Sequence, residues 1–176
     1  MQENNNIYVS SRGLLKSCEY FSLTPYSSTR QLYNYPQLKT IKNIKNTSIY
    51  ICNSAIPHFI NVMLPQIDFS FTLVSGDSDD IIPQEVLNNT EYNKLLNDNR
   101  VIHWFCQNMT LDHNKITRIP IGLDYHTLSQ RPLWGPISNC HDQEKMLIMI
   151  KEKSVPFWNR NVKCYGNFQF NIQSKL

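Results

Sequence analysis

Hydrophobic positions along this chain gather in short runs, and the segments between the runs have the spacing of amphipathic helices. The runs are rich in β-branched and aromatic residues, a composition typical of buried β-strands. Five runs predict strands, at residues 48–52, 69–75, 101–108, 115–122 and 162–170.

The segments between these runs predict helices from their end signals and their apolar spacing. They cover residues 54–64, 84–97 and 141–153, with a shorter helical turn at residues 14–20. The first stops before Pro65, because the residue before a proline disfavours helical geometry. The last has acidic residues near its start and lysines near its end, as the helix dipole favours, and Met146, Leu147 and Ile150 form its apolar face. Residues 21–36, with Pro, Ser and Tyr, predict a loop.

Short apolar strands that alternate with helices favour a mostly parallel sheet covered on both faces. The 176 residues suffice for one ordinary domain with its own core. The sequence therefore predicts a single α/β domain of Rossmann-like type.

Charge and cysteine usage narrow the function classes. The net charge is +3 and the basic residues are scattered, so a nucleic-acid interface is not expected. Lys39, Lys42 and Lys45 form either a solvated face or a small phosphate-binding patch.

The five cysteines contain no CxxC pair, and the N-terminus lacks the layout of a secretion signal, so we expect reduced thiols and a cytoplasmic location. The uncharged stretch 46–67 contains several Asn and two Pro, so no membrane span is expected.

Three polar clusters follow predicted strands, at residues 75–79, 107–108 and 122–126. In an open parallel sheet, ligands bind beyond the carboxyl ends of the strands, so these clusters predict a shared site. Each has a plainer interpretation as turn chemistry or as a strand end.

The first cluster contains Ser75, Gly76 and Asp77, which would line the cleft. Gly76 allows a sharp turn or a close approach to a ligand, and Asp77 suits a hydrogen bond to a sugar hydroxyl or the work of a general base. In the second cluster, Asn108 would hydrogen-bond a substrate hydroxyl.

The third cluster offers a glycine, a carboxylate, an aromatic ring and an imidazole: Gly122, Asp124, Tyr125 and His126. We expect them to complete the rim of the site. Asp77 is the first candidate for a catalytic base and His126 the second.

Other chemistries have weaker signals. Cys106 could act as a nucleophile with His126 as its base, although nothing local marks it. His103, Cys106, Cys140 and His141 have no standard metal-ligand spacing, so no metal site is predicted, and His103 is more simply a core histidine. With five glycines and neither a Walker A loop nor GxGxxG, a standard dinucleotide site is excluded.

Three segments together resemble exostosin-like glycosyltransferases of giant DNA viruses and some bacteria. They are IYVSSRGLLKSC at residues 7–18, LVSGDSDDIIP at 73–83, and WFCQN with KITRIPIGLDYHTL at 104–108 and 115–128. The phrase IPIGLDYHT after a strand is the most specific piece. The resemblance implies a GT-B architecture of two Rossmann-like domains, with a location in the host cytoplasm or the virion if the source is viral.

The chain has about half the length that this architecture implies. Residues 1–160 would be the N-terminal, acceptor-side domain, and residues 161–176 the start of a truncated second domain or a C-terminal tail. The implied substrates are a nucleotide sugar and a glycan or protein acceptor, with no other cofactor. Arg12 and Arg131 are the candidates for charge near the leaving diphosphate, which basic residues of the second half would normally supply.

Two alternatives stay open beside an acceptor-side domain of a sugar-transferring enzyme. The second is a non-catalytic vestigial or binding domain that lacks the donor-binding half, which a second chain would supply. A small nucleotide-dependent hydrolase with its site at the same strand ends is the third possibility.

Overall fold

The computed structural model describes residues 3–20, 47–132 and 135–161 of the chain. Its strands form one parallel sheet in the order β1-β2-β3-β4. They are β1 (Thr47–Cys52), β2 (Phe71–Gly76), β3 (Val101–Gln107) and β4 (Ile116–Ile119). The predicted α/β class of Rossmann-like type is therefore confirmed.

One layer of helices covers one face of the sheet. Residues 53–66 join β1 to β2 through a helical stretch that passes through 3-10, α and π geometry, with its α segment α2 at Ile56–His58. Helix α3 (Asn89–Asn97) lies between β2 and β3 in the chain. The two lie side by side, because the Asn61 side chain donates to Glu91 Oε1 at 2.8 Å. The core beneath them includes Phe59, Leu64, Phe71, Leu73 and Trp104.

The opposite face is covered at β1 and β2 by helix α1 (Ser11–Ser17). Leu15 and Cys18 pack there against Tyr50, while the flanking Ile49 and Ile51 point into the larger core. Side chains of a strand alternate between its faces, so β1 is buried on both sides, as its apolar run predicts.

Strands β3 and β4 run parallel although only residues 108–115 connect them. Parallel neighbours usually need a longer crossover. The short connection suffices here because β4 begins opposite Trp104, in the middle of β3, and so the chain returns over only part of that strand.

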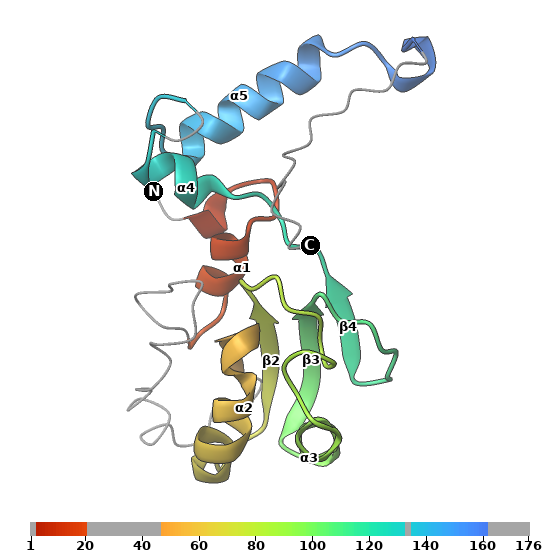
Figure 1. Ribbon diagram of the computed structural model, residues 1–176. Helices are drawn as coiled ribbons and strands as arrows, with labels where there is room; N and C mark the ends of the chain where they lie inside the picture. The colour runs from red at the N-terminus through yellow and green to blue at the C-terminus, as the bar shows by residue number, and fades with distance from the viewer. Residues whose placement is uncertain (1–2, 21–46, 133–134, 162–176) are drawn as a thin grey trace, which may run out of the picture.

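Helices α4 (Tyr125–Gln130) and α5 (Cys140–Lys153) lie beyond the carboxyl ends of the strands, next to the N-terminal segment (Figure 1). The Glu144 carboxylate of α5 accepts the backbone N–H groups of Ile7 at 2.6 Å and Tyr8 at 3.0 Å. A single-turn 3-10 helix, η1 (Glu3–Asn5), precedes this segment, and another, η6 (Phe157–Asn159), follows α5.

Several predicted boundaries are wrong, and side-chain caps explain why. The helical turn expected at 14–20 begins at Ser11, because Ser10 caps it by accepting from Gly13 N–H at 3.0 Å. The helix expected at 84–97 begins at Asn89, because Asn88 and Glu91 form a capping box. Helix α4 was not predicted at all; it begins inside the cluster at residues 122–126.

The predicted apolar face of α5 packs inward only in part: Leu147 is half-buried, whereas Met146 and Ile150 are 52% and 55% exposed. The loop predicted at 21–36 and the strand predicted at 162–170 lie outside the described residues, as does nearly all of the predicted tail 161–176. Within the described ranges, no helix is both long enough and apolar enough to cross a bilayer.

Candidate functional site

The carboxyl ends of β2, β3 and β4 lie together at one edge of the sheet, since Ser75 pairs with Cys106 and Gln107 with Ile119. The loop that follows each strand contains a residue with positive φ: Asp77 at 60°, Asn108 at 57° and Gly122 at 76°. Positive φ is uncommon for residues other than glycine, and such strain gathers at functional sites. The three predicted polar clusters therefore meet at one edge.

The loop after β2 is held in place from β3. The backbone N–H of Asp77 donates to Gln107 Oε1 at 3.2 Å, and Gln107 Nε2 donates to the carbonyl of Ser78 at 3.4 Å. Gln107 is itself buried, and its carbonyl accepts from Asn53 Nδ2 at 3.1 Å. This amide side chain thus fixes the turn that presents Asp77.

Gly76 has a different role from the one predicted, because the sharp turn falls on Asp77. Gly76 is the last residue of β2, and a Cβ there would lie 2.7 Å from Gln107 Oε1 and 3.2 Å from the Tyr50 hydroxyl. Its missing side chain leaves room for Gln107 to reach the Asp77 loop.

Asn108 supports the same loop from the next position. Its side chain donates to the carbonyl of Ser78 at 2.9 Å and to that of Asp80 at 3.4 Å. The predicted hydrogen bond to a substrate therefore competes with bonds that this side chain already makes within the protein.

The loop after β4 brings the N-terminal segment to the site. Leu123 N–H donates to the carbonyl of Val9 at 2.8 Å, and Ser10 and Leu123 form a parallel bridge. A Cβ on Gly122 would lie 2.8 Å from the Val9 carbonyl oxygen, so this close approach requires glycine as much as the positive φ does. Ser11 and Arg12, at the start of α1, reach the site in this way.

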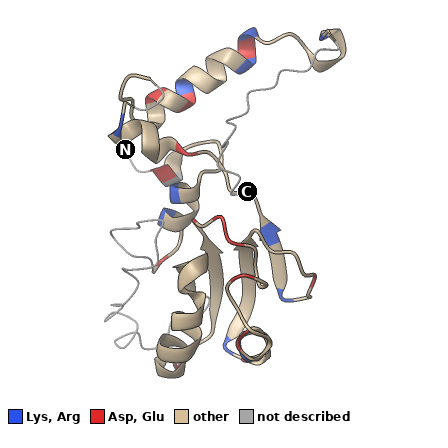
Figure 2. Cartoon of the chain, in the orientation of Figure 1, with Lys and Arg blue, Asp and Glu red and all other residues tan. Residues whose placement is uncertain are grey.

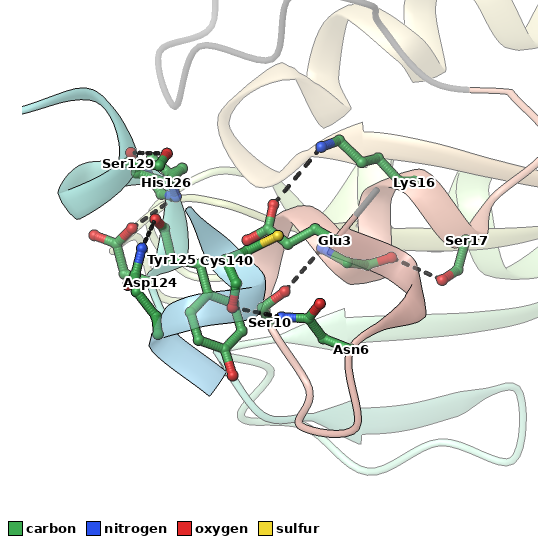
Figure 3. A network of polar contacts seen from close by, with 12 residues as sticks. Glu3, Asn6, Ser10, Lys16, Ser17, Asp124, Tyr125, His126, Ser129 and Cys140 are labelled. Carbon is green, nitrogen blue, oxygen red and sulfur yellow. Dashed lines mark hydrogen bonds and ion pairs between the residues drawn. The ribbon is translucent and has the colours of Figure 1, made fainter. Parts of the chain in front are cut away.

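Asp124 caps helix α4, and Figure 3 shows it facing His126 at the start of that helix. It accepts from the Thr127 N–H at 2.9 Å and from the Thr127 hydroxyl at 2.5 Å. The Nδ1 of His126 lies 2.7 Å from Asp124 Oδ1, close enough for an ion pair but without hydrogen-bond geometry. The carboxylate therefore both starts the helix and lies against the imidazole.

These groups surround an open pocket of about 430 Å³. Its lining comes from α1, the loops after β2 and β4, the end of β3 and the start of α4. The residues are Ser11, Asp77, Ser78, Asp79, Asp80, Gln107, Ile121, Gly122, Leu123, Asp124 and His126. Four of them are carboxylates, and Figure 2 shows acidic positions in the loops above the sheet, with basic positions in α1.

Burial acts on the pKa of three of the titratable groups that line the pocket. It raises the pKa of Asp77, against the opposing charges of Arg12 and His126. For Asp124, burial acts in the same direction, but hydrogen bonds from Thr127 and the charge of His126 outweigh it, so the pKa is lowered. Burial and the nearby Arg12 lower the pKa of His126 from its ordinary value of 6.5, so the neutral imidazole predominates at pH 7, and the charge that acts on Asp77 and Asp124 is that of its protonated form.

Three atoms at the site have no hydrogen-bond partner among the described residues although they are buried: Asp77 Oδ2, Arg12 Nε and His126 Nδ1. Buried polar atoms are usually satisfied, and exceptions mark functional sites or bound molecules. Asp77 Oδ2 is thus a buried acceptor beside the pocket that has no partner among the residues that the structure describes.

Six of the ten predicted site residues are not in the pocket lining. Gly76, Asn108, Arg12 and Tyr125 each adjoin a lining residue in the chain. Ser75 is fully buried; its hydroxyl accepts from Trp104 Nε1 at 2.9 Å and lies 3.2 Å from Cys106 Sγ. Tyr125 is buried at the start of α4, and Arg131 is exposed just beyond the end of that helix. The structure therefore brings together Asp77, Gly122, Asp124 and His126, with Asn108 and Arg12 as supporting neighbours.

The cysteine chemistry considered from sequence does not fit the structure. Cys106 is fully buried, and burial raises the pKa of its thiol to about 12, so it stays protonated and is no nucleophile. His103 lies on β3 with Nε2 2.8 Å from the Thr117 hydroxyl. Across residues 3–20, 47–132 and 135–161, no three His, Cys, Asp or Glu side chains gather closely enough to hold a metal ion.

Sequence reasoning missed Ser11 and Ser78, and it treated Gln107 as a strand end. The signal for Gln107 was its place at the end of a strand next to Asn108. Ser11 had no such signal, because only the bridge between residues 10 and 123 carries it to the site.

The pocket combines carboxylate acceptors, hydroxyls and a neutral imidazole, which is a chemistry suited to a polyhydroxylated ligand. Comparisons with models of protein families, with curated proteins and with solved structures find no match for this chain. The function is therefore inferred from the geometry of the pocket.

Proposed function

We propose that this domain binds a carbohydrate acceptor and is the acceptor-side half of a glycosyltransferase that uses a nucleotide sugar. One observation carries the proposal: Asp77, Asp124 and His126 converge from two loops on one pocket at the carboxyl edge of a parallel sheet. This is the edge where open α/β sheets bind ligands.

In the proposed reaction, Asp77 takes the proton of an acceptor hydroxyl. The hydroxyl oxygen bonds to the anomeric carbon of the donor, and the bond from that carbon to the diphosphate breaks. A raised pKa makes Asp77 a stronger base than an ordinary carboxylate, and its Oδ2 has no partner among the described residues. The neutral His126, beside Asp124, would orient a second hydroxyl.

The charge of the pocket supports the acceptor side rather than the donor side. The lining carries Asp77, Asp79, Asp80 and Asp124 and includes no lysine or arginine from the described residues. Four carboxylates repel a diphosphate but accept hydrogen bonds from neutral hydroxyls. We infer that residues outside this pocket, on a second domain or a second chain, hold the diphosphate of the donor.

A carbohydrate-binding domain without turnover is the second candidate. It is favoured by the same lack of cationic lining, because sugar transfer needs positive charge or dipoles at the leaving group.

The test is a thermal-shift screen of the purified chain against simple sugars, free nucleotides and nucleotide sugars. A ligand at a hundred times its dissociation constant adds about 2.7 kcal/mol to stability. We expect shifts with sugars that are lost in Asp77→Ala and kept in Glu152→Ala, which removes an exposed carboxylate outside the pocket lining. A shift with free nucleotides alone would overturn the assignment to the acceptor side.

Mass spectrometry then separates the two candidates. The reaction mixtures contain nucleotide sugars together with those sugars that raised the melting temperature of the protein. Glycosylated acceptor supports the transferase. Binding without product, in the presence of a second half that restores the donor site, supports the binding domain.

A further inference from the structure

Helix α5 has three large apolar residues on its outer side. Glu144 is its one buried residue among those described, and it faces the backbone of Ile7 and Tyr8. On the opposite side, Met146 is 52% exposed, Met149 39% and Ile150 55%. At 3.6 residues per turn, these three side chains share one stripe that points away from Glu144.

The stripe has charged ends of opposite sign. Asp142 continues it toward the start of the helix and Lys153 toward the end, and both are exposed. The stripe is defined here as Asp142, Met146, Met149, Ile150 and Lys153. No described residue covers it, although a surface helix normally turns such a face toward the core.

Beyond the helix, the exposed apolar surface continues. Val155, Phe157 and Trp158 are 53%, 79% and 81% exposed, and Figure 1 shows this segment projecting with α5 away from the sheet. Large aromatic side chains are typical anchors of protein interfaces.

We propose that the stripe pairs with the same stripe of a second copy of this chain, with the two α5 helices antiparallel. In this register Asp142 of one copy lies opposite Lys153 of the other, and Met146 lies opposite Met149. Both pairs repeat across a two-fold axis, so one surface complements itself, as an isologous dimer requires.

The charges select this orientation. In a parallel pair, Asp142 would lie opposite Asp142 and Lys153 opposite Lys153, and like charges in contact disfavour association. Antiparallel helices at the usual small crossing angle, with axes 8–10 Å apart, would let the methionine and isoleucine side chains interdigitate.

The expected dimer is weak and depends on concentration. A stable interface buries about 800 Å² on each partner, which is more than one face of a short helix offers. Phe157 and Trp158 would enlarge the contact but lie at its rim. We therefore expect monomer and dimer in exchange rather than a permanent pair.

Sedimentation equilibrium of the full chain tests the proposal. The average mass should rise with concentration from 20.7 kDa toward twice that value. Met146→Glu places a charge in the buried contact between the two helices and should raise the dissociation constant of the dimer by about tenfold or more. The matched control is Val62→Glu, at an apolar residue 46% exposed on another helical stretch, which should leave the constant unchanged. A chain that stays monomeric at every concentration, or a dimer insensitive to Met146→Glu, overturns the proposal.

Charge exchange tests the orientation. Asp142→Lys and Lys153→Asp should each weaken self-association, since each variant alone presents like charges at both ends of the stripe. The double variant that carries both substitutions should associate as tightly as the wild type, because opposite charges again face each other at both ends of an antiparallel pair, whereas a parallel pair would still bring like charges together. A double variant that associates no more tightly than the single variants rules out the antiparallel register.

Asp142 also accepts from Asn139 Nδ2 at 2.5 Å near the helix start, so Asp142→Lys can weaken α5 itself. Far-UV circular dichroism separates this effect from lost pairing. If Asp142→Lys has the wild-type spectrum and associates more weakly, the result supports the proposal. If its helix signal falls, the effect on association is taken from the Lys153→Asp variant instead.

Discussion

At the scale of single residues, Asp77 combines a strained backbone with a partly buried carboxyl group. One oxygen of this group has no hydrogen-bond partner among the described residues. Burial raises its pKa above the ordinary value of 3.8. The folded protein therefore holds this proton more tightly than the unfolded chain. By linkage, the contribution of Asp77 to stability falls as the pH rises from about 3.8 through the pKa of the folded state.

The first prediction concerns Asp77→Asn, which cannot ionise and keeps a residue that tolerates positive φ. The melting temperature of the variant should exceed that of the wild type at neutral pH, and the difference should vanish below about pH 3.8. Calorimetry across this pH range measures both. Asp79→Asn is the control, as an exposed carboxylate of the same loop. An equal gain in both variants would mean that net charge, and not burial of Asp77, causes the effect.

The same substitution should lower function while it raises stability. If Asp77 is the base, turnover by the assembled enzyme should fall about 100- to 10,000-fold in Asp77→Asn. Initial rates with saturating acceptor measure this. Unchanged turnover assigns the base elsewhere, with His126 as the next residue to replace.

Gly122 is required for two separate reasons, its positive φ of 76° and its approach to the backbone of residues 9 and 10. Gly122→Ala should therefore destabilise the fold by about 1–3 kcal/mol, measured by urea unfolding. Gly135→Ala is the matched control, since its φ of 154° is also unfavourable but the nearest atom to a new Cβ is 4.0 Å away. Equal losses of stability in the two variants would mean that the close contact with the N-terminal segment adds nothing to the cost of Gly122→Ala.

At the scale of elements, side-chain caps rather than apolar spacing decide where helices begin. Leu87 at helical spacing suggested that α3 starts before it, yet the capping box of Asn88 and Glu91 starts the helix after it. A cap satisfies backbone N–H groups that spacing alone leaves unpaired. The sequence pattern Asn-x-x-Glu was present and could have corrected the prediction.

The contribution of the α3 cap to the stability of the protein can be measured. Asn88→Ala should destabilise the protein by about 1 kcal/mol, because Glu91 N–H loses its acceptor at 2.9 Å. Asn93→Ala, at an exposed position inside the same helix, should be neutral or slightly stabilising by helix propensity. Thermal unfolding of both variants gives the comparison, and equal effects would contradict a capping role.

At the scale of the whole molecule, Glu144 connects the last helix to the first segment of the chain. Its carboxylate accepts from Ile7 and Tyr8, and Asn6 Nδ2 donates to the Cys140 carbonyl at 3.2 Å. The segment then leads to Ser11, which lines the pocket, and to Arg12, whose charge acts on Asp77. Contacts between distant parts of the chain thus complete the site.

Glu144→Ala should release this segment. Hydrogen bonds to a charged acceptor contribute about 1.5–3 kcal/mol, so amide exchange at Ile7 and Tyr8 should become much faster. Hydrogen–deuterium exchange of the N-terminal peptide measures it, and sugar binding should weaken in parallel. Glu152→Ala, an exposed carboxylate near the other end of the same helix, should change neither. Protection that persists in Glu144→Ala would show that other contacts hold the segment.

The sequence by itself determined the parallel sheet and the edge that carries the site. Its strands are short apolar runs whose burial on both faces needs no knowledge of distant contacts, and polar clusters at their ends marked Asp77, Asp124 and His126. Only the tertiary structure decided which polar groups were free. Ser75 and Asn108 make bonds within the protein, Gln107 orients Asp77, and α5 turns its apolar face outward, because each of these outcomes depends on partners far away in the chain.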